Sequence, residues 1–232
     1  MRLILFDIDG TLIRSHGAGR LALQKALEEL YGSAGPIEEY RMGGKIDSQI
    51  ITDLLTAMGT PPNEIETRLP TIYAKMAEKG SKIFWDKQIK PCSGVEILLP
   101  KLRQHDGVVL GLLTGNSSLT APLKLKAAGI NPDQFRVCAY GSDGNNRNEL
   151  PAVAYKRANL LTGSEVNGKN TVIIGDTPAD ILCAKSGKAT AVAVASGWHS
   201  SKTLQQYQPD YLLEDLKETE RVIEILLGHA LY

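Results

Sequence analysis

Short apolar runs alternate with helical patterns along much of the chain. Five runs rich in Val, Ile and Leu lack clean alternation, which is typical of strands buried on both faces of a parallel sheet. They span residues 3–6, 108–113, 136–139, 171–174 and 190–194. Because helical patterns separate the last four runs, the order strand–helix–strand predicts a doubly wound, Rossmann-like α/β fold with right-handed crossovers.

The helical patterns between and after these runs show apolar residues at three- and four-residue spacing. The predicted helices span residues 95–104, 119–128, 150–161, 179–186 and 217–227. Gly129 and Gly187 follow two of them directly. We expect both glycines to adopt the left-handed conformation that ends many helices.

The first crossover is anomalous, because the segment between residues 6 and 108 is far longer than a parallel strand pair needs. It holds three amphipathic helical patterns and no convincing strand. Asp47 is expected to cap the second of these helices, and the third is expected to end at Gly80. The sequence therefore predicts an α/β core made of residues 1–14 and 95–232, with an inserted helical cap at residues 15–94.

Composition and charge narrow the choice of partners. The chain has 232 residues, with 26 basic and 26 acidic side chains and a net charge of 0, which favours neither nucleic acid nor a membrane surface as the partner. No stretch is long enough to span a bilayer, and the first apolar run is too short for a signal peptide. Three widely spaced cysteines without a CxxC pattern favour reduced thiols. We expect a cytoplasmic monomer or homodimer.

Two carboxylates end the first predicted strand. Asp7 and Asp9 stand two residues apart in "FDIDGTL", so their side chains point the same way. Like charges this close disfavour ionisation of each other. The pair therefore needs a cation, a shared proton or full solvation.

Further polar residues follow the second and fourth predicted strands. Thr114, Gly115 and Asn116 follow the second, and Asp176 and Asp180 follow the fourth. Ligands of open parallel sheets bind beyond the carboxyl ends of the strands, so we expect these residues to share one crevice with the first acid pair. Carboxylates and carbonyls suit a hard divalent ion, and we expect Mg²⁺ to relieve the repulsion.

These residue types suit phosphoryl transfer. A carboxylate can attack phosphorus, and a second acid can protonate the leaving group and then activate water. The Thr114 hydroxyl and the backbone N–H groups near Gly115 and Asn116 can bind phosphate oxygens. Gly10 allows the backbone to turn sharply beside the ligand.

The segments "DIDGT", "LLTGN" and "GDTPAD" resemble the first, second and fourth motifs of the haloacid dehalogenase superfamily. The insertion resembles the helical cap of its first type. The resemblance implies that Asp7 is the nucleophile, Asp9 the general acid/base and Thr114 a phosphate ligand. It also implies that Mg²⁺ is held by the Asp7 carboxylate, the Asp9 backbone carbonyl and Asp176, with Asp180 supporting the metal.

The third motif departs from the pattern of the resembling superfamily, in which a Lys precedes the helix before the fourth strand. Here Arg147 stands in that place, in "NNRNELPAVAYKRA". Its fixed charge can offset the charges of the phosphate and of Asp7. Lys156 is the alternative, although a solvated position on a helix also accounts for it.

The loop "MGGKIDSQI" precedes the second helix of the insertion and carries Lys45. Cap loops of the resembling family read the part of the substrate beyond the phosphate, so we expect Lys45 to bind substrate, with a solvated surface lysine as the alternative. His16 and His199 are expected near the crevice, in linker or packing roles or in contact with substrate. His105 and His229 are expected at the surface.

The predicted function is that of a Mg²⁺-dependent phosphatase acting on a small phosphorylated metabolite, similar to the phosphoglycolate phosphatase-like branch. Retention of Asp9 favours phosphate esters, because the dehalogenases and phosphonate hydrolases of the superfamily lack an acid there. A phosphomutase with the same core is one alternative. A non-catalytic regulatory or binding protein on the same fold is another.

Overall fold

The computed structural model describes residues 1–228, so His229 lies outside the described residues. Its centre is a parallel sheet with the strand order β5-β4-β1-β6-β7-β8. The strands are β1 (Arg2–Phe6), β4 (Val108–Leu113), β5 (Val137–Ala139), β6 (Thr171–Gly175), β7 (Thr190–Val194) and β8 (Tyr211–Leu213). All five strands predicted from the sequence are present, and the order reverses at β1, which places β4 on one side and β6 on the other.

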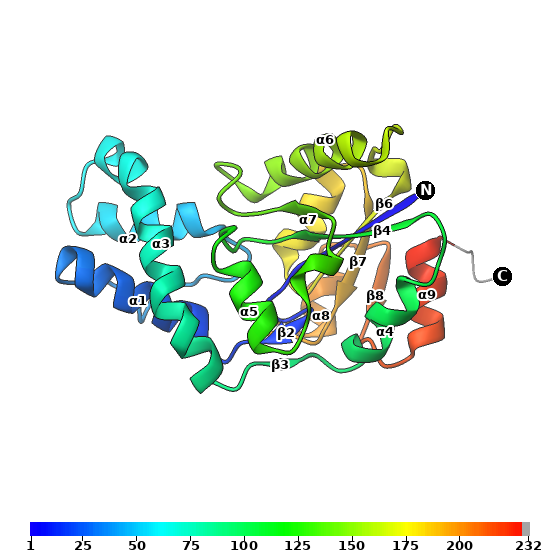
Figure 1. Cartoon of the computed structure of the whole chain (residues 1–232), viewed down its shortest axis with the longest axis horizontal. Helices are drawn as coiled ribbons and strands as arrows, with labels where there is room; N and C mark the ends of the chain where they lie inside the picture. Colours follow the sequence, from blue (N-terminus) through cyan, green and yellow to red (C-terminus); the bar gives the residue numbers. More distant parts are fainter. Residues whose placement is uncertain (229–232) are drawn as a thin grey trace.

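Helices cover both faces of the sheet (Figure 1). Leu3 and Leu5 of β1 pack in one apolar cluster, and Ile4 and Phe6 pack in another. The first cluster includes residues of α6 (Leu150–Thr162), α7 (Pro178–Ser186) and α8 (Ser201–Gln205); the second includes residues of α4 (Val95–Leu102), α5 (Ala121–Ala127) and α9 (Thr219–Leu227). Burial of alternate residues on two faces explains why β1 reads as a continuous apolar run, and it confirms the doubly wound class.

The segment between β1 and β4 forms a separate group of helices, drawn in blue and cyan in Figure 1. These are α1 (Ala18–Tyr31), α2 (Asp47–Ala57) and α3 (Pro62–Asp86), which share an apolar core of their own. A short antiparallel pair, β2 (Ile13–Arg14) and β3 (Lys90–Pro91), joins the entering and leaving chain. These helices support the predicted division of the chain, which stays a prediction: a core at 1–14 and 95–232 and a cap at 15–94.

Several local expectations were wrong. Helix α3 continues through Gly80 to Asp86, and a Cβ at position 80 would lie 2.6 Å from the Phe84 ring, so this glycine makes room for packing and does not end the helix. Gly187 has φ −78°, and the left-handed residue that ends α7 is instead Lys188, with φ +54°, whereas Gly129 has φ +75° as expected. The chain also forms β8, α8 and three short 3₁₀ helices, Pro132–Gln134, Arg147–Glu149 and Gly168–Asn170, which the sequence did not indicate.

The expected capping role of Asp47 was also wrong. The N-cap of α2 is Ile46, and Asp47 is the first helical residue. Its carboxylate accepts a hydrogen bond from the backbone N–H of Ser117, at 2.7 Å, across the boundary between cap and core. Within residues 1–228, no helix combines the length and the apolar character that crossing a membrane requires.

Candidate active site

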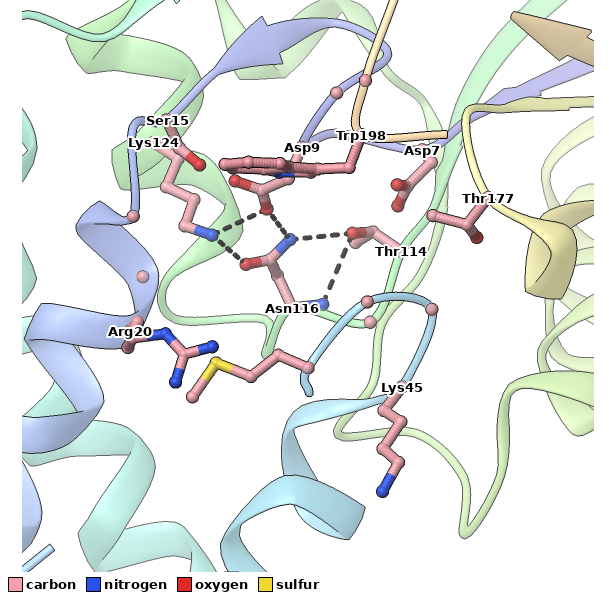
Figure 2. Close-up of a pocket in the computed structure, with 18 of the residues that line it drawn as sticks. Asp7, Asp9, Ser15, Arg20, Lys45, Thr114, Asn116, Lys124, Thr177 and Trp198 are labelled. Carbon is pink, nitrogen blue, oxygen red and sulfur yellow. Dashed lines mark hydrogen bonds and ion pairs between the residues drawn. The ribbon is translucent and has the colours of Figure 1, made fainter. Parts of the chain in front are cut away.

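A cavity of about 930 Å³ lies between the carboxyl ends of β1, β4 and β6 and the helices of the cap. Asp7, Thr114 and Asp176 line it from the core, and Gly19 and Met76 line it from the cap. The crevice therefore lies where ligands of open parallel sheets bind. Figure 2 shows residues that line it.

Three buried carboxylates converge at the core end of this cavity. Asp7, Asp176 and Asp180 each offer an oxygen that lies within 4.8 Å of the others, and none of the three residues is more than 5% exposed. The backbone of Asp7 is held in place because its N–H donates to the carbonyl of Ile174 in β6, at 2.9 Å. The chain thus brings together acids separated by more than 160 residues.

Arg147 is the cation of this cluster. Its Nη2 atom lies 3.0 Å from Asp7 Oδ1, and it also forms an ion pair with Asp180. The residue is only 7% exposed and begins a 3₁₀ helix that leads into α6. Lys156, the alternative for the third motif, is exposed on α6 and is absent from the cavity lining.

Burial and mutual repulsion perturb these acids. Burial raises the pKa of Asp7 to about 6, although the charge of Arg147 opposes the rise. Burial, with the charges of Asp180 and Asp7, raises the pKa of Asp176 to about 8. Burial would lower the pKa of Arg147, but the charges of Asp180 and Asp7 hold it above its usual value. A single guanidinium therefore faces three carboxylates, which leaves the cluster short of positive charge.

Asp180 has two sets of partners. Its Oδ2 accepts hydrogen bonds from the Thr177 backbone N–H at 3.0 Å and from the Thr177 hydroxyl at 2.7 Å. The first of these, together with the bond from the Asp180 backbone N–H to the Thr177 hydroxyl oxygen at 3.4 Å, forms a capping box at the start of α7. Its Oδ1 faces Arg147. Asp180 therefore caps α7 and belongs to the acidic cluster at the same time.

Gly10 is required by the close approach of Asp176. It has φ +87°, and a Cβ there would lie 2.3 Å from Asp176 Oδ2. The Thr11 hydroxyl donates to the other oxygen of Asp176 at 3.3 Å, and the Ser196 hydroxyl donates to the Gly10 carbonyl at 2.7 Å. The turn after β1, which carries Asp7 and Asp9, thus also positions Asp176.

Thr114 is fully buried at the end of β4, and its hydroxyl accepts a hydrogen bond from Asn116 Nδ2 at 2.9 Å. The same Nδ2 donates to Asp9 Oδ2 at 2.8 Å. Asn116 therefore connects the predicted phosphate ligand with the predicted acid/base. Its predicted contact with substrate stays a prediction, because in this structure its amide group is bound to other side chains.

Asp9 is not part of this cluster and pairs instead with a lysine that the sequence analysis missed. Lys124 Nζ donates to Asp9 Oδ2 at 2.7 Å and to Asn116 Oδ1 at 2.5 Å. Burial would raise the pKa of Asp9, but the charge and hydrogen bond of Lys124 hold it below its usual value. Asp7 and Asp9 thus resolve their repulsion by each pairing with a different cation.

A signal for Lys124 was present in the sequence. Ala121 and Leu125 lie on the buried face of α5, and position 124 lies on that face by helical spacing. A lysine on an apolar face needs a partner, because burying an unpaired ammonium is costly. Lys124 is 5% exposed, whereas Lys126 on the same helix is exposed.

The cap loop that carries Lys45 packs directly on the core. A Cβ at Gly115 would lie 2.3 Å from the Lys45 carbonyl oxygen, and one at Gly44 would lie 2.5 Å from the Ala179 Cβ. The Lys45 ammonium turns away from Asp7 and Asp9 (Figure 2) and pairs with Asp53 at 2.9 Å. Its predicted contact with substrate stays a prediction.

The rim of the cavity carries more exposed residues. His16 and His199 line the cavity, as does Trp198, whose side chain is 93% exposed. His16 lies in the turn before α1 with φ +47°. These residues come from the cap hinge and from the loop after β7, so the rim is built from both parts of the chain.

A parallel sheet whose first crossover carries a helical cap over an acidic crevice defines a class of capped α/β enzymes. Residues 4–194 match the family model described as haloacid dehalogenase-like hydrolase. Since this match covers more than half of the chain, the chain belongs to that family. The family, the fold class and the prediction of a hydrolase are confirmed.

Relatives and solved structures agree with this placement. The chain is 24% identical to a protein of Vibrio parahaemolyticus named phosphoglycolate phosphatase, over 97% of each chain. It is 24% identical to a protein of Halalkalibacterium halodurans named pyrophosphatase PpaX, over 96% of each chain. A crystal structure of a hydrolase from Pseudomonas syringae has the same fold, with a TM-score of 0.71 and 22% identity over 97% of this chain and 99% of that one.

Proposed function

We propose that this chain is a Mg²⁺-dependent phosphatase that hydrolyses a small phosphate monoester through an aspartyl-phosphate intermediate on Asp7. One observation carries the proposal. The Asp7 carboxylate lies just beyond the carboxyl end of β1, where the strand order of the sheet reverses. It is 3.0 Å from the guanidinium of Arg147 and beside Asp176 and Asp180. This arrangement aims a nucleophile and a compensating charge at one point of the cavity.

In the first step, an Asp7 oxygen attacks phosphorus, and the bond from phosphorus to the ester oxygen breaks. Asp9, which Lys124 holds ionised in the free site, must first take up a proton, and it then passes this proton to the ester oxygen as that oxygen leaves. The Thr114 hydroxyl and the backbone N–H groups after β4 bind the phosphoryl oxygens. Arg147 offsets the negative charge that Asp7 and the phosphoryl group bring together.

In the second step, water attacks the phosphorus of the aspartyl phosphate. Asp9, now deprotonated, takes a proton from that water, and the bond from phosphorus to Asp7 breaks. Inorganic phosphate leaves, and the Asp7 carboxylate and a protonated Asp9 are restored. The proton gained and lost by Asp9 balances over the two steps.

The residues at the core end fit a divalent ion. Three buried carboxylates face one guanidinium, and their oxygen donors are those that Mg²⁺ prefers. Asp7, Asp176 and the backbone carbonyl of Asp9 would hold the ion, with Asp180 supporting them through its contacts with Thr177 and Arg147. When bound, the ion supplies positive charge that neutralises phosphoryl oxygens.

The cavity suits an anionic substrate. The cationic side chains that line it are Arg14, Arg20, Arg41, Lys45, Lys124 and Arg147. The names of the two relatives indicate phosphoglycolate and pyrophosphate as the first compounds to test. A cytoplasmic location and a monomeric or homodimeric state stay predictions from the sequence.

The test is a panel of phosphate compounds, which includes phosphoglycolate, pyrophosphate, sugar phosphates and p-nitrophenyl phosphate, with release of inorganic phosphate as the measurement. We expect hydrolysis with Mg²⁺, loss of activity in EDTA and recovery when Mg²⁺ is restored. Full activity after exhaustive metal removal would contradict the metal assignment.

The same panel separates the alternatives. A phosphomutase would convert a sugar phosphate into its isomer and release little phosphate. A regulatory or binding protein would bind a compound without turning it over. Activity of the Asp7→Asn variant equal to that of the wild type would contradict the proposed nucleophile.

A further inference from the structure

Lys124 is a buried cation of the site, and it lies outside the recognised motifs. It extends from α5 in the core, it is 5% exposed, and its ammonium binds both Asp9 and Asn116. Figure 2 shows these contacts as one connected network that continues through Asn116 to Thr114. Lys124 therefore contacts the predicted acid/base directly and the predicted phosphate ligand through one amide.

The two oxygens of the Asp9 carboxylate have different surroundings. Oδ2 accepts hydrogen bonds from Lys124 at 2.7 Å and from Asn116 at 2.8 Å. Oδ1 is shielded from solvent and has no hydrogen-bond partner within residues 1–228. Buried carboxylate oxygens are normally paired, so this unpaired oxygen beside the reaction cavity is the one that can carry the proton passed to the leaving group.

Lys124 also separates the two acids of the first strand. Arg147 holds Asp7 within the acidic cluster, and Lys124 holds Asp9 on the side of the cap. Without the ammonium, the Asp9 carboxylate would lose its ion pair and the shorter of the two hydrogen bonds at Oδ2, and it would be freer to turn. The position of Asp9 relative to the leaving oxygen thus depends on Lys124.

The cap completes this arrangement. A Cβ on Gly19 of α1 would lie 2.8 Å from Lys124 Nζ, so α1 passes directly over the ammonium and a side chain there would displace it. The ring of Phe84 in α3 lies 5.9 Å from the same Nζ and shields it on another side. The ammonium is therefore enclosed by two helices of the cap as well as by the core.

We propose that Lys124 is the positioning residue of Asp9: it fixes the carboxylate by Oδ2, leaves Oδ1 to exchange the proton with the leaving group, and does so under the cover of Gly19 and Phe84. This inference rests on the proposed phosphatase function. A buried ion pair that only stabilises the fold would leave the proton transfer of Asp9 unaffected.

The test compares the rate of the phosphorylation step between substrates with different leaving groups. The rate is measured by rapid quench. Lys124→Met removes the charge while keeping the bulk of the side chain. We expect at least about a tenfold slower step for an alkyl phosphate, whose leaving oxygen needs a proton, and a small change for p-nitrophenyl phosphate, whose leaving oxygen does not. Lys126→Met, an exposed position on the same helix, is the matched control and should match the wild type for both.

Gly19→Ala is a second variant that keeps every charge. Its added Cβ meets the flexible end of Lys124, so the cap should fold while the ammonium shifts. We expect the same selective loss with the alkyl phosphate, in smaller degree. Equal losses with both substrates, or no loss in either variant, would overturn the positioning role.

A crystal structure of Lys124→Met tests the inference without using turnover. We expect the Asp9 carboxylate to leave the orientation seen here, and an unchanged orientation would overturn the proposal. Failure of the proposed function looks different, because the wild type would then release no phosphate from any compound of the panel.

Discussion

The core end and the cap end of the cavity are built in different ways. At the core end, Asp7, Thr114, Arg147 and Asp176 are each at most 7% exposed, and contacts with other parts of the core hold them. At the cap end, Lys45 and Arg41 are exposed, and Trp198 is 93% exposed at the rim.

This difference follows from what each end has to do. A reaction at phosphorus needs its charges fixed to within a fraction of an ångström, which buried and partnered side chains provide. Recognition of the rest of the substrate tolerates mobile loops. We therefore expect substitutions at the core end to affect turnover of every substrate, and those at the cap end to affect only some substrates.

Asp7→Asn should cause the largest loss, on the order of a thousandfold or more in kcat, because an amide cannot form the acyl phosphate. Phosphate release from the best compound of the panel is the measurement. Asp106→Asn, at an exposed position before β4, is the matched control and should be as active as the wild type. A kcat for Asp7→Asn close to that of the wild type would contradict the assignment of Asp7 as the nucleophile.

Asp9→Asn should lower kcat by about a hundredfold or more, because the amide keeps its contacts but cannot transfer a proton. Inhibition by inorganic phosphate should stay close to that of the wild type, since Asp9 does not bind the phosphoryl oxygens. A large loss of phosphate binding with little change in kcat would be the opposite of this expectation and would assign Asp9 a binding role.

Arg147→Ala should raise the barrier by about 3 kcal/mol, the usual effect of removing a preorganised electrostatic stabiliser. It also leaves Asp7 and Asp180 without their buried cation, so thermal unfolding should be measured beside kcat. Arg147→Lys should recover part of the rate. Lys156→Ala, on the exposed side of α6, is the control and should have no effect; the reverse ranking would assign the third motif to Lys156.

Lys45→Ala should have the smallest effect and the most selective one. The pair between Lys45 and Asp53 is exposed, and such pairs contribute about 0–1 kcal/mol, so the ammonium is free to turn toward a substrate. We expect kcat/KM to fall about fivefold for a substrate with a second anionic group and to stay unchanged for p-nitrophenyl phosphate. Lys82→Ala, exposed on α3, is the control. Small and equal effects on all substrates would show that Lys45 is a surface lysine.

The sequence predicted the parts of the fold that depend on local patterns. Strands buried on both faces were found because their apolar runs are continuous, as in β1 and β6. β8 was missed because it has three residues and only Leu213 is buried. Gly80 was misread because a glycine that makes room for an aromatic ring has the same local signature as one that ends a helix.

The candidate site divides in the same way. Asp7, Asp9 and Asp176 stand in short motifs at strand ends, so a resemblance could identify them. Lys124 reaches Asp9 only because α5 packs under the cap, and no local motif records that contact. Asp47 was predicted to cap the helix that follows it, because the sequence does not show that the N–H of Ser117 lies beside its carboxylate in space.

The central claim is that Asp7 carries the phosphoryl group, and the direct measurement is to locate that group on the chain. The enzyme is mixed with its best substrate, quenched in acid and reduced with borohydride, which converts an aspartyl phosphate into homoserine, and the peptides are analysed by mass spectrometry. The account predicts this mass change at position 7 in the wild type and its absence in Asp7→Asn. Modification at another residue, or rapid phosphate release with no acyl phosphate at position 7, would contradict it.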